Sequence, residues 1–157
     1  MHSVINIVVA GLGGQGVLKA SDILADAALV AGFDVKKADV HGMSQRGGSV
    51  RSDVRFGPQV LSPMVPPAEA DFLVVLAEDQ VETHRAMLRP DGLLIAPDTI
   101  PAERLSNRRS LNVALLGVLS RKLEITPTVW HEAIRKNLKP SLHESNLAAF
   151  DLGRSDE

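Results

Sequence analysis

The feature that most constrains the fold is a glycine-rich turn between an apolar segment and a helical pattern. Residues 4–10 are mostly β-branched, which is typical of a strand buried in a sheet. Residues 11–16 (GLGGQG) follow directly, and residues 17–31 carry apolar side chains at helical spacing. Such a turn either presents backbone N–H groups to a phosphate or simply lets the helix pack on the strand. The candidate ligand-binding residues are Gly11, Gly13, Gly14, Gln15 and Gly16.

The glycine spacing also leaves a dinucleotide-binding enzyme open as an alternative. Gly11, Gly13 and Gly16 satisfy the dinucleotide fingerprint. In that fold an acidic residue at the end of the second strand holds the ribose, and Asp39 lies a little over twenty residues beyond the glycines. An independent oxidoreductase that binds nicotinamide or flavin is therefore a second hypothesis.

Charge and cysteine content exclude several classes of function. The 157 residues include no cysteine, which rules out disulfides, a thiol nucleophile and cysteine-ligated iron–sulfur clusters within this chain. Lys and Arg number 17 against 19 Asp and Glu, without a basic block, so nucleic-acid binding has no electrostatic support. With no membrane-spanning apolar stretch and no secretion signal, we expect a cytoplasmic protein. We predict no metal ligands and no catalytic side chain.

The remaining patterns predict one α/β domain over residues 1–157. Predicted strands cover residues 33–40, 50–56, 59–61, 72–77 and 93–96, with 50–56 half-exposed and 59–61 as its hairpin return strand. Predicted helices cover 17–31, a segment starting at Glu78, 113–123, a segment from Thr126 to before Pro140, and 142–150, followed by a frayed tail at 153–157. The order predicts a three-layer α/β/α fold with a mostly parallel mixed sheet, an antiparallel hairpin and a helical C-terminal region.

A second glycine-rich segment, residues 41–48 (HGMSQRGG), is the least ordinary part of the chain. It has few apolar side chains, so it cannot stabilise a core, and Arg46 could fork onto a phosphate or a carboxylate. For His41 a hydrogen-bonded loop position is favoured over an acid–base role. We predict contact with a ligand or partner through His41, Gly42, Met43, Gln45, Arg46, Gly47 and Gly48.

Residues 13–16 and 41–48 together resemble the gamma-type domain of the 2-oxoacid:ferredoxin oxidoreductase family. The family pattern is a Gly-Gly-Gln-Gly turn followed some thirty residues later by His-Gly-Met-x-Gln-Arg-Gly-Gly, and both parts are intact here. Within the family the chain is most similar to the small beta subunit of the indolepyruvate-oxidising members. The helical C-terminal region also fits, so the resemblance spans nearly the whole chain.

The resemblance implies a multi-subunit enzyme that decarboxylates an arylpyruvate oxidatively to an acyl-coenzyme A. A large alpha subunit would hold thiamine diphosphate and the iron–sulfur clusters, and ferredoxin would take the electrons. This chain would bind no cofactor by itself; it would dock on the large subunit, help to close the active site at 41–48 and contribute to the coenzyme A site at the glycine turn. A third hypothesis is an interaction module of this family that has lost its catalytic partner.

Overall fold

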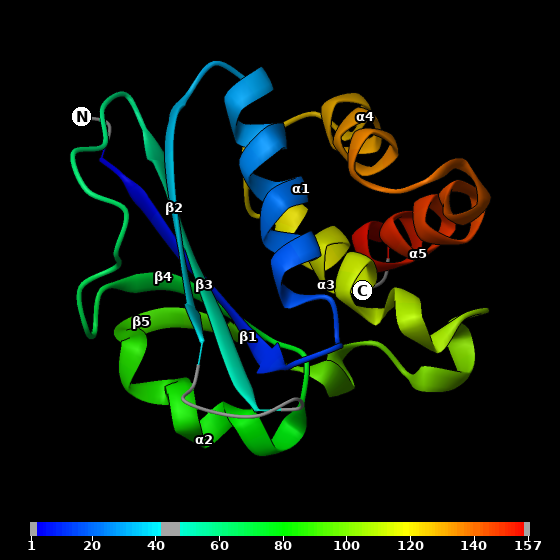
Figure 1. The fold of residues 1–157 in the computed structure, drawn as a ribbon, viewed down its shortest axis with the longest axis horizontal. Helices are drawn as coiled ribbons and strands as arrows, with labels where there is room; N and C mark the ends of the chain where they lie inside the picture. Colours follow the sequence, from blue (N-terminus) through cyan, green and yellow to red (C-terminus); the bar gives the residue numbers. More distant parts are fainter. Residues whose placement is uncertain (1–2, 42–47, 156–157) are drawn as a thin grey trace.

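The computed structural model of the chain describes residues 3–41 and 48–155. Within these residues one mixed sheet lies at the centre of the fold (Figure 1). Its strands are β1 (Ile5–Leu12), β2 (Asp34–His41), β3 (Ser49–Gly57), β4 (Ala70–Val75) and β5 (Leu88–Ile95), in the spatial order β2-β3-β1-β4-β5. β4 is parallel to β1 and β5, whereas β3 is antiparallel to both of its neighbours. The expected mixed, mostly parallel sheet is therefore confirmed, with β2 as an edge strand.

The antiparallel hairpin exists, but its predicted partner strand was wrong. β3 pairs with β2 on one side and β1 on the other, so no edge of β3 is left for a return strand at 59–61. Val60 lies next to Asp34 instead, and its backbone N–H donates to Asp34 Oδ2 over 2.7 Å. The hairpin is formed by β2 and β3 around residues 42–48.

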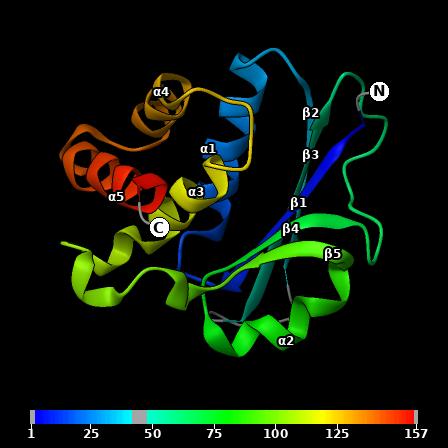
Figure 2. The same ribbon diagram turned by 180° about the vertical axis from the view of Figure 1, so that it is seen from behind.

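Helices cover both faces of the sheet, unequally (Figures 1 and 2). On one face lie α1 (Val17–Val30), α3 (Leu111–Ser120), α4 (Pro127–Asn137) and α5 (His143–Ser155). On the other face α2 (Val81–His84) is a single turn between 3-10 turns at Glu78–Gln80 and Arg85–Met87, where a longer helix was expected. Further 3-10 turns lie at Pro97–Thr99, Ala102–Arg104, Arg108–Ser110 and Pro140–Leu142. No helix of the described ranges is long and apolar enough to span a membrane.

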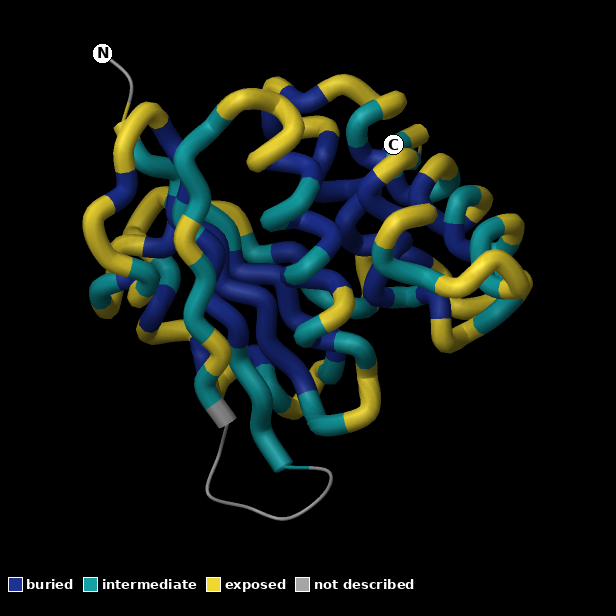
Figure 3. The backbone as a smooth tube through the Cα atoms, turned by 45° about the horizontal axis from the view of Figure 1, so that its top comes forward, coloured by how far each residue is buried: buried dark blue, intermediate teal, exposed yellow. Residues whose placement is uncertain are grey.

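The core is divided by the sheet, because successive side chains of a strand point to opposite faces. Ile7 and Val9 of β1 pack in the larger cluster with α1, α3, α4 and α5, while Val8 packs with Leu73 and Val81 in a smaller cluster on the other side. The buried strands therefore run through the middle of the molecule (Figure 3). The three-layer prediction is confirmed.

The end of the chain is packed rather than frayed. α5 continues to Ser155, and Gly153 lies so close to α3 that a Cβ built on it would come within 1.9 Å of the Ala114 carbonyl oxygen. A Cβ on Gly117 would likewise meet Phe150 O at 2.2 Å. Two glycines thus let the two helix backbones approach closely, which the predicted tail at 153–157 missed; residues 156 and 157 lie outside the described ranges.

Candidate functional site

The two glycine-rich segments meet at one edge of the sheet. The parallel strands β1, β4 and β5 all end there, and β3 begins there at Ser49 (Figure 1). Gly13 N donates to Gly48 O over 2.9 Å, which joins the turn directly to the end of the second segment. Ligands of open α/β sheets bind outside this carboxyl edge. Gly42, Met43, Gln45, Arg46 and Gly47 lie outside the described residues, and their contacts, like that of His41 at the end of β2, stay predictions.

The amide of Gln15 holds the shape of the turn. Its Oε1 accepts from Leu12 N over 2.7 Å, and its Nε2 lies 3.4 Å from Leu76 O, just beyond β4. The side chain therefore connects the ends of two neighbouring strands. Gly11 lies beneath it, since a Cβ there would come within 2.9 Å of Gln15 Oε1. Both residues therefore help to fix the conformation of the turn.

Gly16 starts α1 in a conformation that favours glycine. Its φ is +85°, and its carbonyl oxygen accepts from Asn112 Nδ2 of α3 over 3.1 Å. Gly14 has a similar φ of +89° but faces open space. The first turn of α1 contains no acidic residue and Gly16 supplies no side-chain cap, so the helix itself contributes no carboxylate to the positive end of its dipole.

A pocket of about 460 Å³ opens at this helix start. It is lined by Gly14, Gln15, Gly16, Leu76, Arg108, Arg109, Leu111 and Asn112. The two arginines come from the turn that leads into α3, where Asn107 Oδ1 accepts from Arg109 N over 2.9 Å and orders the backbone. A glycine turn, a helix N-terminus and two guanidinium groups together form an anion-binding environment. The sequence reading missed both arginines, because they lie some ninety residues beyond the glycines in a segment without a motif.

A second, mostly apolar pocket of about 500 Å³ adjoins the first. Its lining residues are Glu78, Pro97, Asp98, Ile100, Pro101, Ala102, Leu105, Arg108 and Leu111. Arg108 and Leu111 border both pockets. The edge therefore offers a pocket lined by two arginines beside a mostly apolar pocket that also contains Glu78 and Asp98, an arrangement that suits a ligand with phosphates at one part and an apolar portion at another.

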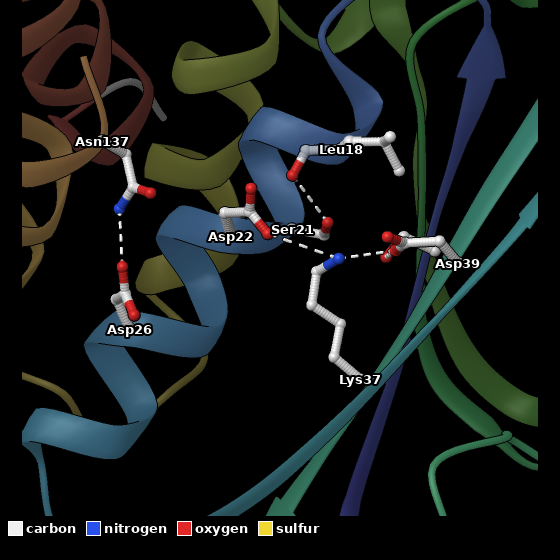
Figure 4. Close-up of polar contacts among 8 residues, drawn as sticks. Leu18, Ser21, Asp22, Asp26, Lys37, Asp39 and Asn137 are labelled. Atoms are coloured by element: carbon white, nitrogen blue, oxygen red, sulfur yellow. Dashed lines mark hydrogen bonds and ion pairs between the residues drawn. The ribbon is translucent and has the colours of Figure 1, made fainter. Parts of the chain in front are cut away.

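Asp39, the proposed ribose ligand, is not beside the glycine turn. β3 lies between β1 and β2, so Asp39 is two strands away from β1, unlike the acid of a dinucleotide-binding fold. Its Oδ1 accepts from Ser52 Oγ over 2.7 Å and lies 2.5 Å from Lys37 Nζ. Lys37 also reaches Asp22 of α1 at 3.3 Å, so the acid helps to hold α1 on β2 (Figure 4). The structure thus removes the main support for the dinucleotide hypothesis.

A polar group on the α2 side of the same edge was also missed. His84 of α2 is buried, and its Nε2 lies 3.1 Å from Ser49 Oγ at the start of β3. Burial lowers the pKa of His84 below its usual value, the nearby Arg51 lowers it further, and Asp53 partly opposes both. The neutral ring therefore ties α2 to the first residue of β3. No three His, Asp or Glu side chains in the described part of the chain gather as a metal site.

Comparisons with known proteins agree on one family. The family model described as pyruvate ferredoxin/flavodoxin oxidoreductase matches residues 6–155. Indolepyruvate oxidoreductase subunit IorB of Pyrococcus horikoshii is 36% identical in an alignment 190 positions long, which covers 94% of this chain and 93% of that protein.

Two solved structures share the fold. The gamma subunit of a keto/oxoacid ferredoxin oxidoreductase from Geobacter sulfurreducens superposes with a TM-score of 0.79 at 20% identity, over 97% of this chain and 95% of that one. The 2-oxoglutarate:ferredoxin oxidoreductase of Magnetococcus marinus, with 2-oxoglutarate, coenzyme A and succinyl-CoA bound, gives 0.81 at 22% identity. The match covers 96% of this chain but only 30% of that longer one.

Proposed function

Because this chain belongs to the pyruvate ferredoxin/flavodoxin oxidoreductase family, we propose that it is the small subunit of a complex that oxidises an arylpyruvate and passes the electrons to ferredoxin. Loss of carbon dioxide from a 2-oxoacid needs an electron sink, which thiamine diphosphate supplies in a partner subunit. Single-electron transfer to ferredoxin needs iron–sulfur clusters, and a chain without cysteine cannot bind cysteine-ligated ones. The proposed role of this chain is therefore to bind coenzyme A, to position it, and to help enclose the active site.

The two neighbouring pockets support the proposal of a coenzyme A site. Phosphate groups would lie in the cationic pocket against the backbone of Gly14 and Gly16, with Arg108 and Arg109 as forked donors. An apolar part of the same ligand would enter the second pocket past Leu111. Support comes from the coenzyme A named for the Magnetococcus marinus structure, whose longer chain contains this fold.

If this chain is a subunit, we expect segment 41–48 to contact the large subunit. Its far end is fastened to the glycine turn by the bond between Gly13 and Gly48, so a partner that contacts the segment also lies close to the proposed coenzyme A site. We propose that the large subunit covers this edge and that the active site is closed there. An interaction module without a catalytic partner would keep the same surface but would not co-purify with a thiamine-dependent subunit.

The coenzyme A site is tested by removing its charges. In the reconstituted complex, Arg108→Ala with Arg109→Ala should raise the KM for coenzyme A by roughly 10- to 100-fold, since the two exposed guanidinium groups together should contribute about 1.5–3 kcal/mol of charge-assisted hydrogen bonding. The KM for the 2-oxoacid should stay within about twofold, because uniform loss of one ligand's binding leaves the other site intact. Arg135→Ala, which removes an exposed arginine from α4, is the matched control. Equal coenzyme A kinetics in all three proteins would refute the site.

The 2-oxoacid is tested separately, on the wild-type complex purified through this chain. We expect indolepyruvate to support ferredoxin reduction with a higher kcat/KM than 2-oxoglutarate, in line with the similarity to the indolepyruvate subunit. Preference for 2-oxoglutarate would refute the substrate and leave the family assignment in place. Failure to recover any thiamine-dependent subunit would favour the interaction module.

A further inference from the structure

Two carboxylates border the second, mostly apolar pocket, and an apolar part of a ligand does not account for them. Glu78 follows β4 and Asp98 follows β5, and both line this pocket of about 500 Å³. Neither carboxylate makes a hydrogen bond or an ion pair with another residue that the structure describes. An ionised carboxylate only accepts hydrogen bonds, so two of them without a partner beside an apolar cavity suit a ligand group that donates.

The rest of the wall of this pocket suits a largely apolar ring. Aliphatic side chains and rigid proline rings come from the turns that follow β5, namely Pro97, Ile100, Pro101 and Leu105. Ligand pockets typically combine such a wall with a few polar groups that fix orientation and specificity. A heterocycle that carries an amino group matches both parts of this pocket, because its ring is apolar and its N–H groups donate.

Charge is distributed unequally between the two pockets, and this favours one direction of a bound ligand. Among the described residues, the lining of the first pocket includes Arg108 and Arg109 but no acidic side chain, whereas Glu78 and Asp98 line the second. Phosphate groups are therefore attracted to the first pocket and repelled from the second. A ligand with phosphates and an amino-bearing ring would place its ring in the second pocket, with Arg108 at the border between the two.

The order of the strands favours the same direction. In the sheet order β2-β3-β1-β4-β5, segment 41–48 connects β2 to β3, the glycine turn follows β1, and the second pocket lies beyond the ends of β4 and β5 (Figure 1). The two pockets therefore follow one another along the edge, away from segment 41–48. The thiol of coenzyme A has to reach the active site proposed at that segment, so its other end, the adenine, is the part that extends towards β5.

We propose that the second pocket binds the adenine of coenzyme A, with Glu78 and Asp98 as acceptors for its 6-amino group. This rests on the proposed function, since it requires coenzyme A in the neighbouring pocket. A purine with a carbonyl at the same position, as in hypoxanthine, would set an acceptor against the two carboxylates and leave them unpaired. A site that is built to bind a donor rejects an analogue that lacks it, so the two side chains determine specificity for the adenine form.

The test compares coenzyme A with its deaminated analogue, which carries hypoxanthine in place of adenine, in the complex co-expressed with the large subunit. The wild-type complex should have a KM roughly 5- to 10-fold higher for the analogue, at an unchanged kcat, since the two carboxylates are exposed. In Glu78→Gln with Asp98→Asn the ratio of the two KM values should fall to about 1–2, because an amide can donate to the carbonyl as well as accept from the amine. Asp79→Asn with Glu103→Gln removes two acidic charges that lie near the pocket without lining it, and should keep the wild-type ratio.

A ratio measured within each protein separates recognition of the ring from changes in stability or assembly, which alter both KM values together. A wild-type ratio near 1, or a ratio that keeps its wild-type value in the double variant, overturns the inference and leaves the proposed coenzyme A site in place. If Arg108→Ala with Arg109→Ala leaves the KM for coenzyme A unchanged, the proposed site fails and the inference falls with it. If the Glu78 and Asp98 variant does not assemble, competition on the wild-type complex decides. Adenosine diphosphate should then compete with coenzyme A more strongly than inosine diphosphate does, by roughly the same 5- to 10-fold, and equal inhibition overturns the inference.

Discussion

Two glycines of the same turn allow the packing at the helix start to be separated from backbone strain. Gly14 and Gly16 have nearly equal positive φ values, +89° and +85°. A Cβ on Gly14 would meet no atom within 4 Å, whereas one on Gly16 would come within 2.5 Å of Asn112 Nδ2. Alanine at either position therefore meets the same conformational penalty, and only Gly16→Ala displaces a neighbour.

The expected losses in the free energy of unfolding follow from these two environments. Alanine in the left-handed region costs about 1–2 kcal/mol, part of which is recovered because alanine restricts the unfolded chain, so Gly14→Ala should lower the free energy of unfolding by about 1 kcal/mol. Gly16→Ala also forces the buried Asn112 amide away from Gly16 O, to which it donates over 3.1 Å. Losing a buried hydrogen bond adds about 1–3 kcal/mol, for a total of about 2–4 kcal/mol.

Urea denaturation of both variants measures the difference, and a double variant assigns it. Once Asn112→Ala removes the clashing amide, adding Gly16→Ala should cost no more than Gly14→Ala does, which gives a coupling energy of about 1–3 kcal/mol. Coenzyme A binding to the assembled complex should weaken in both variants, since Gly14 and Gly16 both line the proposed coenzyme A pocket. Equal losses of stability at the two glycines, or no coupling to Asn112, would refute the reasoning.

Three further outcomes follow from the described contacts. Gly153→Ala should destabilise the chain by about 3 kcal/mol or prevent folding, because its Cβ would meet the rigid Ala114 carbonyl; urea denaturation measures it. Ala68→Gly should raise the free energy of unfolding by about 0.5–1 kcal/mol, because Ala68 is exposed and has a φ of +64°; an unchanged urea midpoint contradicts this. The lowered pKa of His84 means that the unfolded chain takes up its proton first as pH falls, so its contribution is complete above the usual value of about 6.5 and is lost below it. His84→Gln should flatten the fall in stability between pH 7.5 and 5.5, which denaturation at the two values would reveal.

The elements that the sequence predicted well are those whose pattern is set by burial on both sides. The β-branched run before the glycines and the apolar run in β4 have no polar face, so a central strand is the arrangement that buries them. The glycine turn and α1 could be predicted from local sequence alone. The apolar stripe of the helix ends near Gly32, which has a φ of +103°. The type of sheet and the three layers could therefore be predicted from the sequence.

The hairpin partner could not be predicted, because the alternation of side chains in β3 does not show which neighbouring strand pairs with it. Arg51, Asp53 and Arg55 alternate with apolar residues, which is typical of a strand with one face in water. In the structure that polar face lies under residues 58–69, and Asp53 is fully buried with its oxygens engaged by Arg51 and Val65 N. Polar side chains that anchor a covering segment have the same periodicity as solvated ones, so spacing alone cannot distinguish them.

The placement of β3 explains why the two ends of the second glycine-rich segment, His41 and Gly48, lie at the same edge of the sheet as the glycine turn. In a dinucleotide-binding fold β2 would lie directly beside β1, and its acid would face the glycine turn. Here the chain turns back after β2 and inserts β3 between them, so β3 takes the position beside β1. The connection between β2 and β3 consequently starts and ends at the carboxyl edge, and Gly48 O reaches Gly13 N at 2.9 Å. The inserted strand thus moves Asp39 away from the turn and brings Gly48 next to it. Changes confined to that segment should therefore affect partner and coenzyme A binding without unfolding the sheet.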